Sequence, residues 1–406
     1  MLARLLTQTR LLTQISIGSG VVLCTLGLAR AETTQTPLDA IIGQSLFERV
    51  WVSAPASTKA TDGLGPLFNA RSCAACHPGG GRAEISLSAQ GDIIGPGLVA
   101  RFTQEAAQGD PFYGRQLQSS AVQGRDAEGK LSLQADGVHV KELTAGPLHP
   151  HTHVSGRIAP QLHGLAHLAA LDPEVIAANA DPEDKNKDGI SGRVHWVRDA
   201  TGGQQAGRFG WRAAHPSLTS QSAEAFLIDL GLSTSLFPSP AGDCTTAQTA
   251  CLESPHGDPT VEIPDSLLTL IIRYLENLSP PKAQADSRGE ALFSATGCAA
   301  CHIPRLVQKE GAVPPAYTDL LLHDMGEALA SPALHKEVAA SEWRTAPLWG
   351  MGQAIAQNST FLHDGRAATI RQAIEFHGGE ALSARQAFET LSAENKQILL
   401  TFVETR

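Results

Sequence analysis

Cysteine and methionine are scarce in this chain of 406 residues, which contains seven cysteines and three methionines. Aromatic residues make up only 5% of the sequence, so few large rings are available to fill a core. Basic residues are outnumbered by acidic ones, 31 to 41, and the net charge of -10 argues against a nucleic-acid-binding protein. The hydrophobic fraction of 42% is typical of a globular protein, and the length allows two or three domains.

Long apolar runs are absent after the N-terminus. There, Arg4 and Arg10 precede the 14-residue apolar segment ISIGSGVVLCTLGL, and Ala29–Ala31 fits a small-x-small cleavage site. This pattern predicts a signal peptide over residues 1–31. An uncleaved anchor is the alternative, but the segment is shorter than the roughly 20 residues that a spanning helix needs. We therefore expect a periplasmic protein with no membrane span after cleavage.

The few cysteines divide into three groups. Cys24 leaves with the signal peptide; it could suggest a lipid anchor, but Leu23 precedes it where a small residue is expected. Cys244 and Cys251 stand close together in a loop rich in Pro and Thr, and an oxidising compartment favours a disulfide between them. The other four form two CxxCH motifs, which contain Cys73, Cys76 and His77, and Cys298, Cys301 and His302.

A CxxC pair can be a redox dithiol, half of a zinc site, or a haem attachment site. The histidine that directly follows each pair favours haem, because c-type haem takes two thioether bonds from the cysteines and an axial ligand from that histidine. A dithiol needs no such histidine, and a zinc site built from both pairs leaves both histidines unexplained. The sequence therefore predicts two covalently bound c-type haems.

The similarity between the two motifs extends beyond them. LFNARSCAACH and LFSATGCAACH match at eight of eleven positions. We predict a mainly α fold with two cytochrome c-like haem domains and irregular, loop-rich insertions. A helix is expected over residues 264–278, where apolar residues recur at helical spacing and the segment SPPK follows. The predicted organisation is a signal peptide (1–31), an N-terminal haem domain (32–150), a middle region (151–281) and a C-terminal haem domain (282–406).

The second axial ligand of each haem decides between electron transfer and chemistry, because an iron with an open face can bind peroxide or oxygen. For the second haem, His377 ends the expected helix TIRQAIEFH and is the preferred candidate. The alternatives are His363, His323, Met325 and Met351.

No comparable partner follows the first motif. Residues 78–97 contain neither His nor Met, and histidines return only at His139 and in the cluster of His149, His151 and His153. A solvated loop explains this cluster as well as a metal or haem ligand does. The asymmetry suggests one closed and one open haem. Peroxide cleavage at an open iron needs a group that moves a proton, and the sequence offers Arg115, Gln118 and Glu128 as candidates.

Several segments together resemble the di-haem oxidoreductase, putative peroxidase family, which is related to bacterial di-haem cytochrome c peroxidases. They are GLGPLFNARSCAACH, DGISGR, GRFGWRA, YTDLLLHDMG, EWRTAPLWGMG and FLHDGRA…FHGGEA. The resemblance implies peroxide-linked redox chemistry in the periplasm. Where the related peroxidases carry a methionine ligand this chain has His377, which implies two histidine ligands on the second haem. The region of Gln118 and Glu128 looks similar to the distal region of the peroxidatic haem.

The segment DKNKDGISG has the alternating oxygens of a calcium loop at Asp184, Asn186 and Asp188, but His195 stands at the twelfth position, where an acidic residue is expected. A calcium between the haem domains of related peroxidases favours Ca²⁺ here. The other interpretation is a turn rich in Asp and Asn that ends in glycine.

We therefore predict a peroxidase-like oxidoreductase in which a small cytochrome or copper protein donates electrons and hydrogen peroxide, or another small oxidant, accepts them. One alternative is an electron carrier with both irons six-coordinate, which a histidine between residues 139 and 167 at the first haem would favour. The other is an enzyme that oxidises a protein or an organic substrate.

Overall fold

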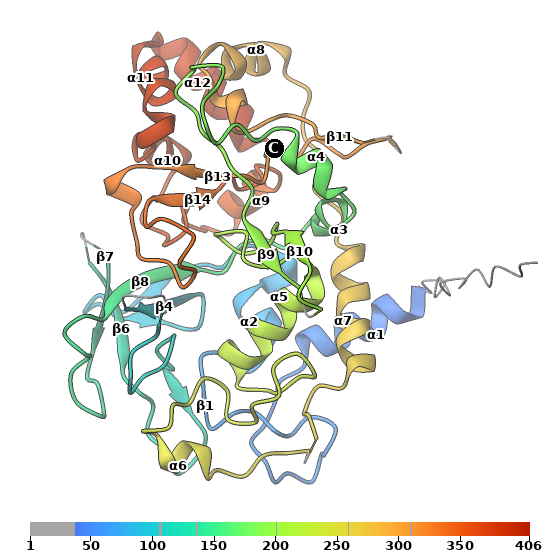
Figure 1. Cartoon of the computed structure of the whole chain (residues 1–406), viewed down its shortest axis with the longest axis vertical. Helices are drawn as coiled ribbons and strands as arrows, with labels where there is room; N and C mark the ends of the chain where they lie inside the picture. The colour runs from blue at the N-terminus through green and yellow to red at the C-terminus, as the bar shows by residue number, and fades with distance from the viewer. Residues whose placement is uncertain (1–36, 105–107, 135–136, 200, 259, 309–310) are drawn as a thin grey trace, which may run out of the picture. The chain divides into compact units, whose positions relative to one another are not determined.

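Helices and small sheets alternate along the chain in the computed structural model (Figure 1). The structure describes residues 37–104, 108–134, 137–199, 201–258, 260–308 and 311–406. The predicted signal peptide, residues 1–31, therefore lies outside the described residues. Helix accounts for 31% of the structure and strand for 16%, so the fold is partly helical, with more strand than the predicted mainly α class implies. The predicted division at residues 150 and 281 stays a prediction.

The strands of the described segments form seven two-stranded antiparallel sheets, and β4, β6, β7 and β8 lie side by side (Figure 1). They pair as β1 (Leu67–Phe68) with β5 (Ser120–Ala121), β2 (Ser86–Leu87) with β3 (Ile93–Ile94), β4 (Leu98–Thr103) with β8 (His153–Ile158), β6 (Lys130–Gln134) with β7 (Gly137–Lys141), β9 (Trp196–Arg198) with β10 (Gln204–Ala206), β11 (Val307–Gln308) with β12 (Gly311–Ala312), and β13 (Leu322–Asp324) with β14 (Glu342–Arg344).

Most α-helices are short, because glycine and proline interrupt the chain often. They are α1 (Pro37–Glu48), α2 (Cys73–Cys76), α3 (Leu165–Ala169), α4 (Pro173–Ala177), α5 (Leu218–Ala225), α6 (Thr249–Leu252), α7 (Asp265–Asn277), α8 (Ser287–Ala295), α9 (Met351–Ala356), α10 (Ile370–Glu375), α11 (Leu382–Thr390) and α12 (Ala393–Glu404). A π-helical turn, Phe226–Leu230, continues α5. The helix predicted over residues 264–278 is confirmed as α7.

Helices α1 and α7 pack closely against each other (Figure 1). The contact depends on Gly43, because a Cβ atom there would lie 2.0 Å from the carbonyl oxygen of Leu270. Beside it the rings of Phe47 and Tyr274 are 5.0 Å apart. These side chains join a large core cluster that also includes Phe226 and the hydrophobic face of α7.

Replacing Gly43 with alanine is expected to destabilise the fold by about 1–3 kcal/mol, the range for overpacked sites. The helix axes must move apart, although alanine is the better helix former. Urea unfolding followed by circular dichroism measures the change. Ser45→Ala, at an exposed position of the same helix, is the matched control. Equal stability of the two variants would contradict the close packing.

The C-terminal helices enclose a second core cluster. Helices α8, α11 and α12 contribute Phe293, Phe388 and Phe402, all nearly inaccessible to solvent. Figure 1 shows α8, α10, α11 and α12 gathered together. This cluster also includes Met351 and packs against Cys298. The second CxxCH motif therefore packs against a hydrophobic core that is separate from the core around α1 and α7.

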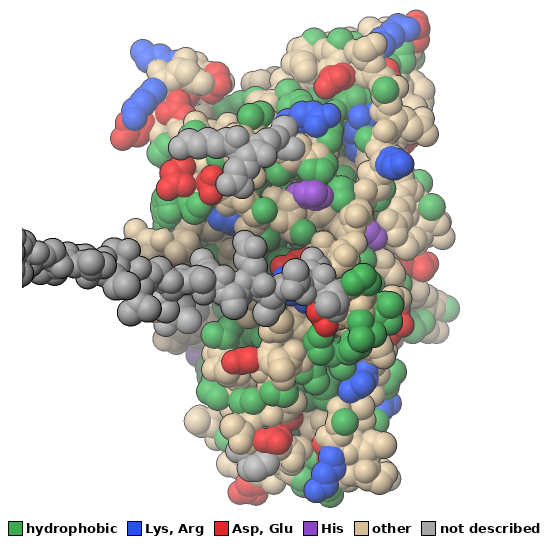
Figure 2. Space-filling view, turned by 90° about the vertical axis from the view of Figure 1, so that its right-hand side faces the viewer, with side chains coloured by type: hydrophobic (Ala, Val, Ile, Leu, Met, Phe, Trp, Pro, Cys, Tyr) green, Lys and Arg blue, Asp and Glu red, His purple; other side chains and the backbone are tan. Residues whose placement is uncertain are grey.

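The predicted disulfide is present between Cys244 and Cys251. No helix among the described residues is long and apolar enough to cross a membrane. On the face drawn in Figure 2, the described Lys and Arg side chains are scattered among Asp and Glu and form no continuous basic patch.

Candidate haem-binding cavity

One cavity of about 1110 Å³, partly open to solvent, reaches both CxxCH motifs. Its wall includes Cys73, Cys76 and His77 from the first motif and Cys298, Cys301 and His302 from the second. Most of the lining surface is apolar, as is typical of a cofactor site, but it also includes eight arginines and four carboxylates. The two motifs, far apart in the sequence, therefore face one continuous space.

The first motif forms the short helix α2. The Ser72 hydroxyl accepts a hydrogen bond from the amide of Ala75, and the amide of His77 donates to the carbonyl of Cys73 at 2.9 Å. Burial lowers the pKa of His77 to about 4, so its ring is neutral at pH 7. The buried Nδ1 of His77 has no hydrogen-bond partner, and neither cysteine forms a disulfide. The motif thus presents two thiols and a neutral imidazole at the cavity wall.

The second motif begins at Gly297, whose φ of 84° suits glycine, and continues as a 3₁₀ turn. His302 Nδ1 lies 2.8 Å from the carbonyl oxygen of Tyr317. A carbonyl can only accept, so Nδ1 carries the proton and Nε2 keeps a lone pair for a metal. Burial lowers the pKa of His302 to about 4, which keeps the ring neutral.

The competing interpretations of CxxC do not match this arrangement. Among the described residues, no group of potential metal ligands joins cysteines of the two motifs, so a four-cysteine zinc site is not formed. Burial raises the pKa of Cys73 to about 12 and that of Cys76 further, whereas a reactive redox dithiol has a lowered pKa.

All five candidates for the second axial ligand of the second haem line the cavity, namely His323, Met325, Met351, His363 and His377. His377 Nδ1 lies 2.7 Å from the carbonyl oxygen of Ala373, which leaves Nε2 unprotonated. Its ring is close enough to lower the pKa of His302. His363 instead stacks on Trp343, with ring centroids 3.6 Å apart.

His323 has no nitrogen available for iron. Its Nε2 lies 2.8 Å from Asp319 and its Nδ1 lies 2.7 Å from Glu380. Although burial acts to lower it, these carboxylates raise the pKa of His323 to about 12. The ring is therefore a buried cation that donates from both nitrogens.

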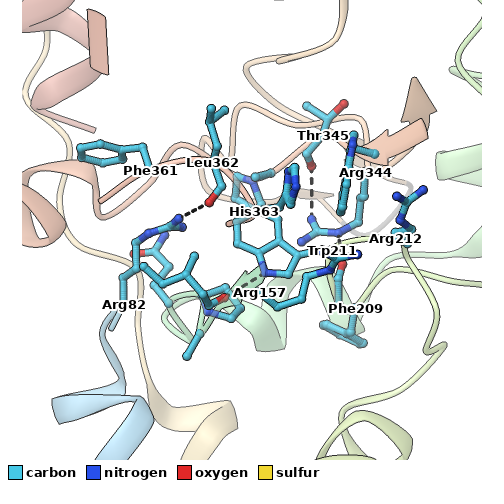
Figure 3. Close-up of a pocket in the computed structure, with 18 of the residues that line it drawn as sticks. Arg82, Arg157, Phe209, Trp211, Arg212, Arg344, Thr345, Phe361, Leu362 and His363 are labelled. Carbon is cyan, nitrogen blue, oxygen red and sulfur yellow. Dashed lines mark hydrogen bonds between the residues drawn. The ribbon is translucent and has the colours of Figure 1, made fainter. Parts of the chain in front are cut away.

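Six arginines that line the cavity form no salt bridge with a carboxylate among the described residues. Arg101 and Arg208 are two of them, and the other four are Arg82, Arg157, Arg212 and Arg344. Figure 3 shows these four around Trp211 and His363. Burial lowers the pKa of each, to about 10 for Arg82, Arg212 and Arg344. Each side chain donates to backbone carbonyls, but none has a carboxylate at salt-bridge distance, so a bound anion would stabilise these buried charges. Haem carries two propionate carboxylates, so these side chains fit two haems.

The three predicted acid–base residues are not equivalent. Arg115 lines the cavity, whereas Gln118 and Glu128 are not among its lining residues. The Glu128 carboxylate accepts hydrogen bonds from the Gln118 amide, at 2.7 Å, and from the Gln248 side chain. Burial raises the pKa of Glu128 to about 8.

The structure brings Glu224 and His215 to the cavity instead, and the sequence reasoning missed both. His215 Nε2 lies 2.9 Å from Glu224, and Arg115 contacts the other carboxylate oxygen at 3.1 Å. Although burial acts to raise it, His215, Arg101 and Arg115 hold the pKa of Glu224 below its usual range. Glu224 belongs to α5. The π-helical turn that continues α5 contacts the residues before Cys73, where the backbone amide of Ala70 donates to the carbonyl oxygen of Asp229.

The remaining predicted ligands are those of the calcium loop, which hydrogen-bond within that loop, and four histidines that do not line the cavity. Asn186 donates to Asp188, and the amide of Gly189 donates to Asp184. These are bonds of an Asx-type turn, and calcium stays a prediction. The histidines at 139, 149, 151 and 153 are not among the residues that line the cavity.

The family model described as "Di-haem oxidoreductase, putative peroxidase" matches residues 127–406. The chain belongs to this family. The match includes the second CxxCH motif and the Glu224 segment, and the first motif precedes it. Membership in the di-haem oxidoreductase family supports haem as the cofactor and redox chemistry as the class of reaction.

Two solved structures are distantly similar to this family member. Hydrazine synthase of Kuenenia stuttgartiensis, pressurised with xenon, aligns at 14% identity with a TM-score of 0.33 over 98% of this chain and 100% of that chain. A MauG-like protein associated with microbial copper homeostasis aligns at 16% identity with a TM-score of 0.29, over 59% and 86%. None of the curated proteins matches the sequence.

Proposed function

We propose that this protein is a periplasmic di-haem c-type oxidoreductase that reduces hydrogen peroxide or another small oxidant with electrons from a small cytochrome or copper protein. The observation that carries the proposal is the single cavity of about 1110 Å³ whose wall contains both CxxCH motifs. A shared space allows two haems to lie close enough for electrons to pass between them.

Each CxxCH motif would hold one haem, and the two haems would have different roles. Cys298 and Cys301 would hold the electron-transfer haem covalently, and His302 and His377 would bind its iron. Cys73 and Cys76 would hold the second haem, with His77 as its ligand. A bound haem with one free face supplies redox chemistry toward peroxide or oxygen. Two neutral imidazoles at the electron-transfer iron imply a lower potential than histidine with methionine.

The charged groups of the cavity have two tasks. The arginines at 82, 157, 212 and 344 would bind the propionates and hold each haem in position. His215 and Arg115 hold Glu224 ionised at neutral pH, so its carboxylate would take a proton from an entering peroxide only transiently and, as a stronger acid than an ordinary glutamate, would return it readily to the leaving oxygen. We therefore assign acid–base work to Glu224 rather than to Glu128.

The alternative of a simple electron carrier has less support. It was expected to bring a histidine between residues 139 and 167 to the first haem, and none of the described histidines in that range lines the cavity. Oxidation of a protein or an organic substrate would use the same open iron. Only an activity assay distinguishes this function from peroxide reduction.

The test combines haem stoichiometry with turnover. The purified, exported protein should contain two covalent haems per chain by pyridine haemochrome analysis. It should consume peroxide when a reduced small cytochrome or copper protein is supplied. Two haems without peroxide consumption would support the carrier, and fewer than two would contradict the assignment of both motifs.

A further inference from the structure

A group of metal-ligating side chains lies beside the cavity, outside the proposed haem ligands, and one of its members, His335, lines the cavity. It consists of His195, His335 and Glu337, whose ligand atoms all lie within 4.8 Å of one another. His195 precedes β9, and the other two belong to the loop Ser331–Glu342. Their meeting is therefore a product of the fold and not of sequence spacing.

His195 is held as a metal ligand would be. Only 1% of its surface is accessible, and its Nδ1 lies 2.8 Å from the carbonyl oxygen of Arg212. The carbonyl accepts from Nδ1, and the other ring nitrogen, Nε2, faces a carboxylate oxygen of Glu337 at 3.3 Å. A backbone carbonyl that fixes the second nitrogen is the usual support of a ligating histidine.

The other two ligands approach from the opposite loop. The rings of His195 and His335 are 5.2 Å apart and nearly perpendicular. The loop is anchored without any ion, because Arg193 donates to the carbonyl of Glu337 at 2.6 Å and Arg212 donates to that of Ala339 at 2.6 Å. A rigid backbone on both sides means that small side-chain rotations suffice to close the site.

We propose that His195, His335 and Glu337 bind a first-row divalent transition metal of the Zn²⁺ class. Two imidazoles and one carboxylate suit zinc and its neighbours, whereas calcium and magnesium prefer oxygen ligands alone. Three protein ligands leave a fourth position open. Since His335 lines the cavity, a metal bound here would lie beside the space that the two CxxCH motifs share. The metal also joins the loop Ser331–Glu342 to the segment before β9.

Zinc binding by the haem-loaded protein tests the proposal. After treatment with a chelator, the protein is dialysed against Zn²⁺, and zinc and iron are counted separately by mass spectrometry. We expect one zinc per chain, with an affinity at least tenfold lower in His335→Ala and Glu337→Gln. Glu337 is exposed, so its variant should fold normally.

The chain provides a matched control for adventitious binding. His149 and His151 are exposed, and their rings lie 5.5 Å apart. The double variant His149→Ala/His151→Ala should retain the zinc. The proposal would be overturned if the protein bound no zinc. It would also be overturned if His335→Ala and Glu337→Gln bound zinc as tightly as the wild type, or if the control variant lost its zinc. A change of haem spin state in His335→Ala would also overturn it, since that residue would then be a haem ligand.

Discussion

Replacing Glu224 with glutamine is expected to lower the rate of peroxide reduction by about 100- to 10,000-fold, the contribution of a positioned acid–base group. The amide keeps the size of the side chain and loses its basicity. Because His215 and Arg115 hold Glu224 ionised, its carboxylate is present at neutral pH as a base, although a weaker one than an ordinary glutamate, whereas glutamine offers no base at all. Steady-state turnover with a reduced donor measures the effect.

The haem content and low-spin spectrum of Glu224→Gln should be unchanged, which separates lost proton transfer from damaged haem binding. Thr219→Ala, at an exposed position of α5, is the matched control. A variant that keeps the wild-type rate would remove Glu224 from the reaction. A parallel test of Glu128→Gln, whose carboxylate hydrogen-bonds Gln118 and Gln248, should show no comparable loss.

The double variant Cys298→Ala/Cys301→Ala should carry one covalent haem in place of two and should lose turnover with the protein donor. The thioether bonds hold the haem that receives electrons, so the first haem would remain attached but could not be reduced by the donor. Haem staining after denaturing electrophoresis reports the covalent haem even if the variant folds poorly.

Cys244→Ala/Cys251→Ala is the matched control, because it also removes two cysteines, and they pair with each other and not with haem. It should retain both haems despite some loss of stability. Full haem content in Cys298→Ala/Cys301→Ala would exclude this motif as an attachment site.

Local sequence signals predicted the features that depend on adjacent residues. The CxxCH motifs, the disulfide between Cys244 and Cys251, and α7 all follow from spacing within a few turns of chain. The β4–β8 sheet was not predicted, because its strands are far apart in the sequence and periodicity does not reveal long-range pairing.

The same limit explains the catalytic candidates. Gln118 and Glu128 were chosen for residue type and for likeness to related peroxidases, but both side chains turn into a hydrogen-bonded network outside the cavity lining. His215 and Glu224 meet because the serine-capped start of α5 places them on the same side of the turn. The sequence signal that could have found the pair is His215 two residues before the N-cap Ser217 of a helix that contains Glu224.

Electron paramagnetic resonance during a stepwise reductive titration tests the central claim most directly. One electron added per protein gives a half-reduced state. In that state the signal of the haem iron that is still ferric can be read. We predict a high-spin ferric signal from one haem beside, or after reduction of, a low-spin haem. Two low-spin haems at every stage would leave the oxidant no iron to bind, and the protein would then be an electron carrier.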